Sequence, residues 1–127
     1  PFDENLYEEC QFWHTNSGYE GFERLYNRTQ NFTAVFACSD TIAYGVMNFA
    51  EKHGLKIPDD FSLIGFDNDS GSEFSHPHLT TFQHDEIKIA DMAAEMLFQQ
   101  IAGIPVPDIV RFPATFIERE SVKKLEN

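Results

Sequence analysis

A carboxylate-rich turn stands directly after an apolar stretch in the middle of the chain. The apolar residues run from Phe61 to Phe66, and Asp67, Asn68 and Asp69 follow at once. A short apolar run bounded by turn residues is typical of a strand that is buried on both faces of a parallel sheet. Ligands of open parallel sheets bind just beyond the carboxyl ends of the strands. Asp67 is therefore a candidate ligand-facing carboxylate, with a turn residue or helix cap as the alternative.

Two earlier apolar runs also end in residues that can contact a ligand. The run from Leu6 to His14 is rich in aromatic residues, which predicts a strand, and Trp13 lies at its end. The run from Ala34 to Cys38 predicts a second strand, and Ser39 follows it. Because the carboxyl ends of parallel strands meet at one edge of a sheet, we expect Trp13, Ser39 and Asp67 to converge there.

Helical periodicity separates these three strands. The first apolar stripe predicts a helix that is capped by Asn16 or Ser17 and runs to about Asn27. The second stripe predicts a helix that the stretch Ser39-Asp40-Thr41 caps, and Gly54 after it suits a left-handed C-terminal residue. The order strand, helix, strand, helix, strand with short links predicts an α/β fold with a parallel sheet and right-handed crossovers.

The second half of the chain carries fewer strand signals and one long helix. The expected elements are an extended piece at 79–82, a helix from Glu86 to Ala102 that Gly103 ends, and short strands at 109–112 and 115–117. The charged tail from Glu118 to Asn127 is expected to fray.

The composition describes a folded and acidic chain. Its 127 residues are enough for one domain with a core and too few for two ordinary ones. No apolar run approaches the roughly 20 residues that span a bilayer, and the start shows no signal-peptide pattern. The net charge of −12 repels phosphate backbones, so this stretch by itself is not expected to be a nucleic-acid-binding surface.

Cys10 and Cys38 are the 2 cysteines of the chain, too few for a disulfide scaffold. Both lie in apolar runs that are predicted to be strands. We therefore expect buried, free thiols in a reducing compartment.

Metal and catalytic chemistry find little support in the sequence. The turn that begins at Asp67 faintly resembles a calcium loop, but Ser72 and His78 stand where that loop needs Gly and Glu. His76 and His78 lack the partner pair of a zinc site. The cysteines have no nucleophile-elbow or papain-like context. We expect no cofactor, no metal and no enzymatic activity.

Four stretches carry motifs in a fixed order. In the stretch from Ala34 to Gly45, a predicted strand ends in Ser-Asp before a helix, and in the stretch from His53 to Asn68, Gly-x-x-x-Pro-x-Asp precedes a strand that ends in Gly-Phe-Asp. The stretch from Pro77 to Thr81 contains Leu-Thr-Thr, and the stretch from Glu118 to Ser121 contains Arg-x-Ser. Their order and spacing resemble the lactose-repressor/galactose-repressor family of bacterial transcription regulators. The resemblance covers Trp13 to Ser121.

The resemblance implies the carboxyl-terminal part of a periplasmic-binding-protein-like effector domain, which has two α/β lobes. Residues 1–81 and about 106–121 would belong to the carboxyl-terminal lobe. Residues 82–105 would form the hinge crossing and a helix of the amino-terminal lobe. By this resemblance we expect the chain to start too late to hold most of that lobe or the family's helix-turn-helix module, through which the full-length protein would bind operator DNA.

Four effector-binding positions follow from the resemblance. Trp13, five residues before Gly18, matches an aromatic residue that stacks on the effector, and Asp67 matches an acidic residue that accepts hydrogen bonds from ligand hydroxyls. Ser39 stands where the family often has Asn, and His84 stands where it often has Gln. The alternatives are a lobe-core role for Trp13, helix entry for Ser39 and a solvated surface for His84.

The resemblance implies a cytoplasmic, dimeric transcription repressor that binds a sugar or sugar phosphate and has no membrane contact. A periplasmic sugar-binding protein of a transporter is the alternative, which the Leu-Thr-Thr and Arg-x-Ser motifs disfavour. The helix at 86–102 carries an apolar face meant for a sheet that is mostly absent. We expect that helix to pack on the remaining lobe or to swap between chains.

Overall fold

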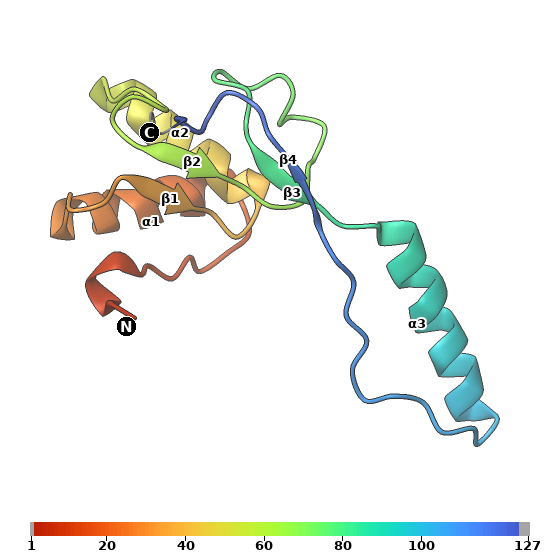
Figure 1. Cartoon of the computed structure of the whole chain (residues 1–127). Helices are drawn as coiled ribbons and strands as arrows, with labels where there is room; N and C mark the ends of the chain where they lie inside the picture. The colour runs from red at the N-terminus through yellow and green to blue at the C-terminus, as the bar shows by residue number, and fades with distance from the viewer. Residues whose placement is uncertain (1, 125–127) are drawn as a thin grey trace.

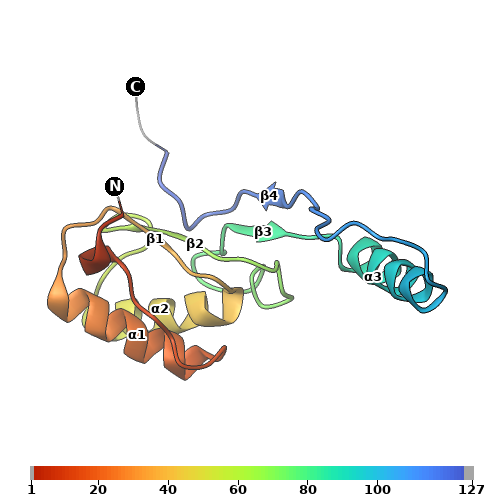
Figure 2. The same cartoon turned by 90° about the horizontal axis from the view of Figure 1, so that it is seen from below.

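Two parallel strands covered by two helices form the body of the protein. The computed structural model describes residues 2–124. Strand β1 (Ala34–Phe36) pairs in parallel with β2 (Ser62–Ile64), and helix α1 (Thr15–Arg28) packs against α2 (Asp40–His53). Figure 1 shows this order, and Figure 2 shows both helices on the same side of the two strands. The predicted α/β class is confirmed.

Aromatic rings fill the space between the helices and the strands. Phe22, Phe49 and Phe61 are almost completely buried, and the Phe22 ring lies 5.2 Å from each of the other two ring centroids. Leu63 of β2 and Leu79 are fully buried in the same core. Aromatic pairs at such distances add to the free energy that burial of their surface provides.

The two helices cross at a pair of glycines. A Cβ atom at Gly18 of α1 would lie 2.2 Å from the carbonyl oxygen of Ile42 in α2. A Cβ atom at Gly45 of α2 would lie 2.2 Å from the carbonyl oxygen of Thr15 in α1. Each helix therefore presents backbone to the backbone of the other, and no larger side chain fits at the crossing.

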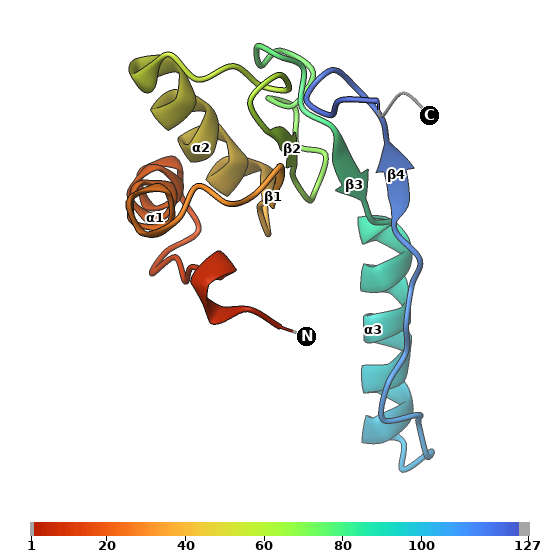
Figure 3. The same ribbon diagram turned by 60° about the vertical axis from the view of Figure 1, so that its left-hand side comes forward.

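A second, smaller unit extends from the body. Strand β3 (Thr81–Gln83) pairs antiparallel with β4 (Thr115–Ile117), and a single parallel bridge between Ile64 and Thr80 connects it to β2. Helix α3 (Glu86–Ile101) leads away from β3, as Figures 1 and 3 show. No residue of α3 is buried, so the expectation that this helix packs on the remaining lobe is wrong, and the swap between chains stays a prediction.

The predicted strand from Leu6 to His14 is wrong. The segment begins with a short 3-10 helix, η1 (Glu4–Leu6), and has no regular structure up to α1. Its carbonyl oxygens bind arginine side chains of α1 instead of a neighbouring strand. Arg28 donates to the carbonyl oxygens of Asn5 (3.2 Å) and Tyr7 (2.6 Å). Among residues 2–124, the regular parallel pairing therefore involves two strands, β1 and β2, and not three.

Several predicted ends of elements also differ from the structure. His14, not Asn16 or Ser17, caps α1. Within the predicted capping stretch Ser39-Asp40-Thr41, Ser39 is the residue that caps α2. The predicted strand at 109–112 does not form. Gly54 adopts the left-handed conformation (φ 70°) after α2, and α3 ends one residue before the predicted Ala102.

The tail is ordered by a buried serine where fraying was expected. Ser121 is fully buried, and its hydroxyl donates to the carbonyl oxygen of Leu63 (2.6 Å) and accepts from the backbone N–H of Thr80 (2.8 Å). The last three residues of that predicted tail lie outside the described residues. Within residues 2–124, every helix is too short or too polar to cross a bilayer.

We predict that Gly45→Ala lowers the free energy of unfolding by about 1–3 kcal/mol, because the new methyl group would push the backbones of α1 and α2 apart. Urea denaturation measures the change. Asn48→Ala is the matched control, since Asn48 is an exposed residue of the same helix. Alanine favours helix by up to about 1 kcal/mol over glycine. A gain of stability in Gly45→Ala would therefore show that the crossing tolerates a side chain.

Candidate functional site

The chain turns sharply at the carboxyl end of β2. Asp67 and Asn68 both have positive φ angles, 111° and 53°, which non-glycine residues rarely adopt. The N–H of Asp67 donates to the carbonyl oxygen of Phe82, 2.8 Å away, so β3 holds the turn in place. Strained backbone of this kind persists only where its surroundings enforce it, and it is concentrated at functional sites.

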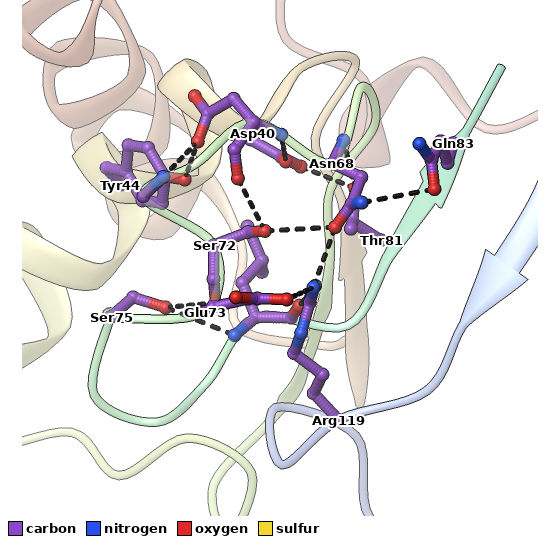
Figure 4. Close-up of polar contacts among 12 residues, drawn as sticks. Asp40, Tyr44, Asn68, Ser72, Glu73, Ser75, Thr81, Gln83 and Arg119 are labelled. Atoms are coloured by element: carbon purple, nitrogen blue, oxygen red, sulfur yellow. Dashed lines mark hydrogen bonds and ion pairs between the residues drawn. The ribbon is translucent and has the colours of Figure 1, made fainter. Parts of the chain in front are cut away.

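A buried carboxylate lies under this turn. Asp40 is fully buried, and one of its oxygens accepts a hydrogen bond from the Thr81 hydroxyl at 2.5 Å. Its other oxygen accepts from the backbone N–H of Asp69 at 2.9 Å. Burial raises the pKa of Asp40, and the two hydrogen bonds oppose that rise. Figure 4 shows how these contacts tie the start of α2 to the turn and to β3.

Asn68 is the centre of a second set of hydrogen bonds. Its side-chain oxygen accepts from Arg119 (2.7 Å) and from the Ser72 hydroxyl (3.2 Å), and its side-chain nitrogen donates to Gln83 (3.2 Å). Arg119 also donates to the carbonyl oxygen of Leu79 (2.8 Å). Residues from the turn, from β3 and from the segment after β4 therefore meet at one amide, as Figure 4 shows.

The turn continues into the outer face of α2 through Asp69. The carboxylate of Asp69 accepts hydrogen bonds from the Tyr44 hydroxyl and from the backbone N–H of Gly71. Burial and the hydrogen bond to Asp69 raise the pKa of Tyr44, which keeps the phenol protonated as a donor. Tyr44 in turn borders a cavity of about 780 Å³ between α2 and the loop 71–77.

Asp67 and His84 come together on the exposed side of the turn. Nδ1 of His84 lies 3.9 Å from Oδ1 of Asp67, and Nε2 lies 3.8 Å from a carboxylate oxygen of Glu86. These separations are too long for direct hydrogen bonds. The imidazole stacks on Phe66, with ring centroids 5.8 Å apart, and its Nδ1 is buried without a partner among the described residues. The carboxylate of Asp67 therefore stays open to solvent beside a half-buried imidazole.

The charge of Asp67 depends on the groups around it. Its side chain is 43% exposed. Partial burial raises the pKa of Asp67, His84 lowers it, and Asp69 and Glu86 raise it further. The net pKa is above the ordinary value of an aspartate, so this carboxylate takes up a proton more readily than an isolated one.

The other two candidate residues occupy different surroundings. Ser39 is buried, and its hydroxyl accepts from the N–H of Ile42 at 3.2 Å, so it acts as the helix cap. The N–H of the next residue, Asp40, donates to Phe66, which places this end of α2 beside the turn. Trp13 is 72% exposed and lines another cavity, of about 770 Å³, between the N-terminal segment and β1.

Sequence reasoning missed Arg119, Thr81 and Asn68 as parts of this site. Thr81 and Arg119 lie within the motifs Leu-Thr-Thr and Arg-x-Ser. The motifs single out these residues but do not indicate which groups their side chains bind. Within residues 2–124, no three or more His, Cys, Asp or Glu side chains gather in a way that could hold a metal ion.

Sequence comparison connects the chain to known proteins. A family model described as a periplasmic binding protein-like domain matches residues 3–122. The HTH-type transcriptional repressor PurR of Mannheimia succiniciproducens is 36% identical over 109 residues, which cover 85% of this chain and 33% of that protein. The HTH-type transcriptional regulator GalR of Escherichia coli is 34% identical, with 84% of this chain and 32% of that protein covered. The chain thus spans about one third of these curated relatives.

Solved structures of transcription regulators also superpose on this chain. A LacI family transcriptional regulator from Enterococcus faecium with bound ribose superposes with a TM-score of 0.71 at 29% identity, and the match covers 95% of this chain and 44% of that one. The lac repressor dimer bound to operator superposes with a TM-score of 0.78 at 25% identity, and the match covers 87% of this chain and 38% of that one.

We predict that Thr81→Val lowers the free energy of unfolding by about 1–3 kcal/mol, because it removes the hydroxyl that donates to the buried carboxylate of Asp40 and replaces it with a methyl group. Urea denaturation again gives the free energy. Thr115→Val in the neighbouring strand β4 is the control, since Thr115 is exposed and should change stability by less than about 0.5 kcal/mol. Equal effects of both substitutions would show that the Asp40 contact contributes nothing.

Proposed function

Because the chain belongs to the lactose-repressor family of periplasmic-binding-protein-like domains, we propose that it is part of the effector-binding domain of a transcription repressor. The observation that carries this proposal is the turn after β2. There a half-exposed carboxylate and an unpartnered imidazole nitrogen stand 3.9 Å apart on a backbone that a buried network holds rigid. Such preorganised polar groups are what a small hydroxylated ligand needs for tight binding.

Asp67 and His84 would be the direct effector contacts at this edge. A carboxylate that accepts from a ligand hydroxyl forms a hydrogen bond worth about 1.5–3 kcal/mol. The imidazole of His84, whose side chain is 28% exposed, would contact the ligand beside Asp67. Its stacking on Phe66 fixes the plane of the imidazole, so this contact has a defined direction.

Trp13 and Ser39 would have unequal roles. The exposed indole of Trp13 offers an apolar face to the C–H face of a sugar ring and an N–H to a hydroxyl. Ser39 already uses its oxygen to cap α2, so its contribution would be limited to donating its own hydroxyl proton. We therefore rank Ser39 below the other three residues as an effector contact.

The ligand class that fits these groups is a sugar or a sugar phosphate. Hydroxyl groups match Asp67 and His84, and an aromatic ring such as that of Trp13 suits a pyranose face. One solved relative, the regulator from Enterococcus faecium, was crystallised with ribose, which supports a sugar as the first class to test.

Residues 1–81 and about 106–121 would form the carboxyl-terminal lobe, and 82–105 would cross the hinge and supply a helix to the amino-terminal lobe. The separation of α3 from α1, α2 and the parallel strands supports this division (Figure 1). Effector binding between the lobes would shift the population between two lobe arrangements. The change requires contacts that differ between the two arrangements, and the turn at Asp67 lies beside the crossing at β3.

Operator DNA would bind through a helix-turn-helix module outside this chain, as the names of the curated relatives suggest. The net charge of −12 supports this assignment, because an acidic surface repels DNA. The protein would act in the cytoplasm and would not be an enzyme. The reported relatives are transcription regulators, which favours this function over that of a transporter's sugar-binding protein.

The cavity between α2 and the loop 71–77 would face a second copy of the chain. Phe74 borders this cavity of about 780 Å³ and is 77% exposed, which is unusual for an aromatic residue on an isolated surface. The solved lac repressor, a structural relative, is a dimer. We therefore assign this surface, formed by the outer face of α2 and the loop 71–77, to the homodimer.

Effector binding is tested with the full-length protein. A thermal-shift screen with D-ribose, D-galactose, cellobiose and glucose 6-phosphate identifies a binder, since a ligand of the folded state raises the melting temperature. We predict that Asp67→Asn and Trp13→Ala each weaken the binding of that ligand about tenfold or more in calorimetry, because each loses a contact worth more than about 1.4 kcal/mol.

Asp91→Asn is the control for charge, since Asp91 is exposed on α3, and it should leave the affinity unchanged. Wild-type affinity in both Asp67→Asn and Trp13→Ala would show that the site lies elsewhere. A panel in which no compound raises the melting temperature would rule out the proposed ligand class.

We predict that Phe74→Glu weakens the homodimer at least about tenfold in sedimentation equilibrium, because it would bury an unpaired charge at the interface. Phe98→Glu, at an exposed position of α3, is the matched substitution that separates this interface from a swapped helix. Dissociation by Phe98→Glu alone would assign the dimer to α3 and contradict the surface named here.

A further inference from the structure

Two thiols that the effector site does not use border the same cavity. Cys10, in the irregular N-terminal segment, and Cys38, directly after β1, both line the cavity of about 770 Å³ between that segment and the strand. Neither forms a disulfide. Figure 1 shows the N-terminal segment running past β1 before it enters α1.

Cys10 is held against the body by its neighbours. Its sulfur lies so close to α1 that a Cβ atom on Gly21 would be 2.8 Å away, and its side chain packs on the apolar core. The carboxylate of Glu8, two residues earlier, binds Arg24 (2.6 Å) and Arg28 (2.8 Å) of α1. Burial raises the pKa of Cys10, and the neighbouring Cys38 raises it further.

Cys38 is the accessible member of the pair, contrary to the expectation that both thiols are buried. Its backbone is fixed on both sides. The N–H of Ala37 donates to the carbonyl oxygen of Ile64 (2.8 Å), and Ser39 caps α2. An oxidant from solution therefore reaches Cys38, while Cys10 is half-buried in the wall of the same cavity.

We propose that Cys10 and Cys38 are a reversible thiol–disulfide pair that responds to peroxide. The Cys38 thiolate attacks hydrogen peroxide, forms a sulfenic acid and releases hydroxide. The sulfur of Cys10 then attacks the sulfenic sulfur, the S–O bond breaks, and the proton of Cys10 leaves with the oxygen as water. The two thiols lose two electrons in total and peroxide gains them, so the step balances. A cellular dithiol reverses it by exchange.

The cavity that Cys10 and Cys38 share leaves room for the two sulfurs to approach each other. The segment 7–14 makes no sheet contacts, and within the described residues β1 pairs only with β2, so the opposite edge of β1 is open. A disulfide needs Cα atoms about 4.4–6.8 Å apart, which is the spacing of two adjacent extended segments. Closure would therefore draw the segment onto the open edge of β1 and shrink the cavity.

A disulfide between Cys10 and Cys38 would affect two nearby residues, Trp13 and Ser39. Cys10 is three residues before Trp13, and Cys38 is adjacent to Ser39. The disulfide would tether the segment that carries the indole to the end of the strand. The proposed redox step does not depend on the proposed effector function and can be tested without any effector.

The test uses the 127-residue chain, whose 2 cysteines make the readout unambiguous. One equivalent of hydrogen peroxide should lower the mass of the monomer by about 2 Da, and peptide mapping should find Cys10 joined to Cys38. Dithiothreitol should restore the mass. The disulfide should also raise the melting temperature by several degrees, because it restricts the unfolded chain.

Two variants and one condition make the proposal falsifiable. In Cys10→Ser, Cys38 should stop at a sulfenic acid that dimedone traps, and in Cys38→Ser the peroxide reactivity should fall at least about tenfold, since Cys10 is protonated and shielded. In 8 M urea the disulfide should form at least about tenfold more slowly than in the folded chain. Equal rates in both states, disulfides between chains only, or oxidation of Cys38 beyond sulfenic acid with Cys10 intact would overturn the proposal.

Discussion

The carboxylate of Asp40 joins three segments that lie far apart in the sequence. It starts α2, receives the Thr81 hydroxyl of β3, and accepts the N–H of Asp69 in the turn after β2. A fully buried carboxylate is costly unless every lone pair has a donor, and here both oxygens are bonded. Asp and Asn adopt positive φ angles more readily than most residues, and the bonds from Asp40 to Asp69 and Thr81 hold the turn that contains Asp67 and Asn68 in place.

The same network decides which side chains stay free to meet a ligand. Asn68 and Asp69 have their polar atoms engaged by Arg119, Ser72, Gln83 and Tyr44. Asp67 and His84 keep polar atoms unengaged at the same turn. The donors around the turn thus bind Asn68 and Asp69 and leave Asp67 and His84, so the unpaired polar atoms of the turn lie on one edge of the protein.

Local sequence patterns predicted the helices well and the polar contacts poorly. Periodicity located α1, α2 and α3 to within a few residues, because the residues of each apolar stripe lie in successive turns of one helix and are therefore close in sequence. The strand expected around Cys10 does not form, because two arginines of α1 donate hydrogen bonds to carbonyl oxygens of this segment. These arginines lie about 15–23 residues further along the chain, so the local sequence pattern does not reveal the contacts. Asp67 could be placed at a strand end from the sequence, but its approach to His84 depends on how β3 returns. Asp40 was taken as a helix cap by the local rule, whereas its side chain turns inward to partners 29 and 41 residues away.

The segment after β4 has a consequence for how the protein acquires its fold during synthesis. Ser121 forms hydrogen bonds with Thr80 and Leu63, at sequence separations of 41 and 58 residues. Arg119 forms a hydrogen bond with Asn68, at a separation of 51 residues. Contacts of such long range form late, since a long loop must close before they bring any gain. A ribosome adds about 5–20 residues per second, so the turn at Asp67 would emerge seconds before the residues that complete it. During synthesis the turn at Asp67 is thus completed late, and a nascent chain that stops before Arg119 would lack the contacts that hold this turn.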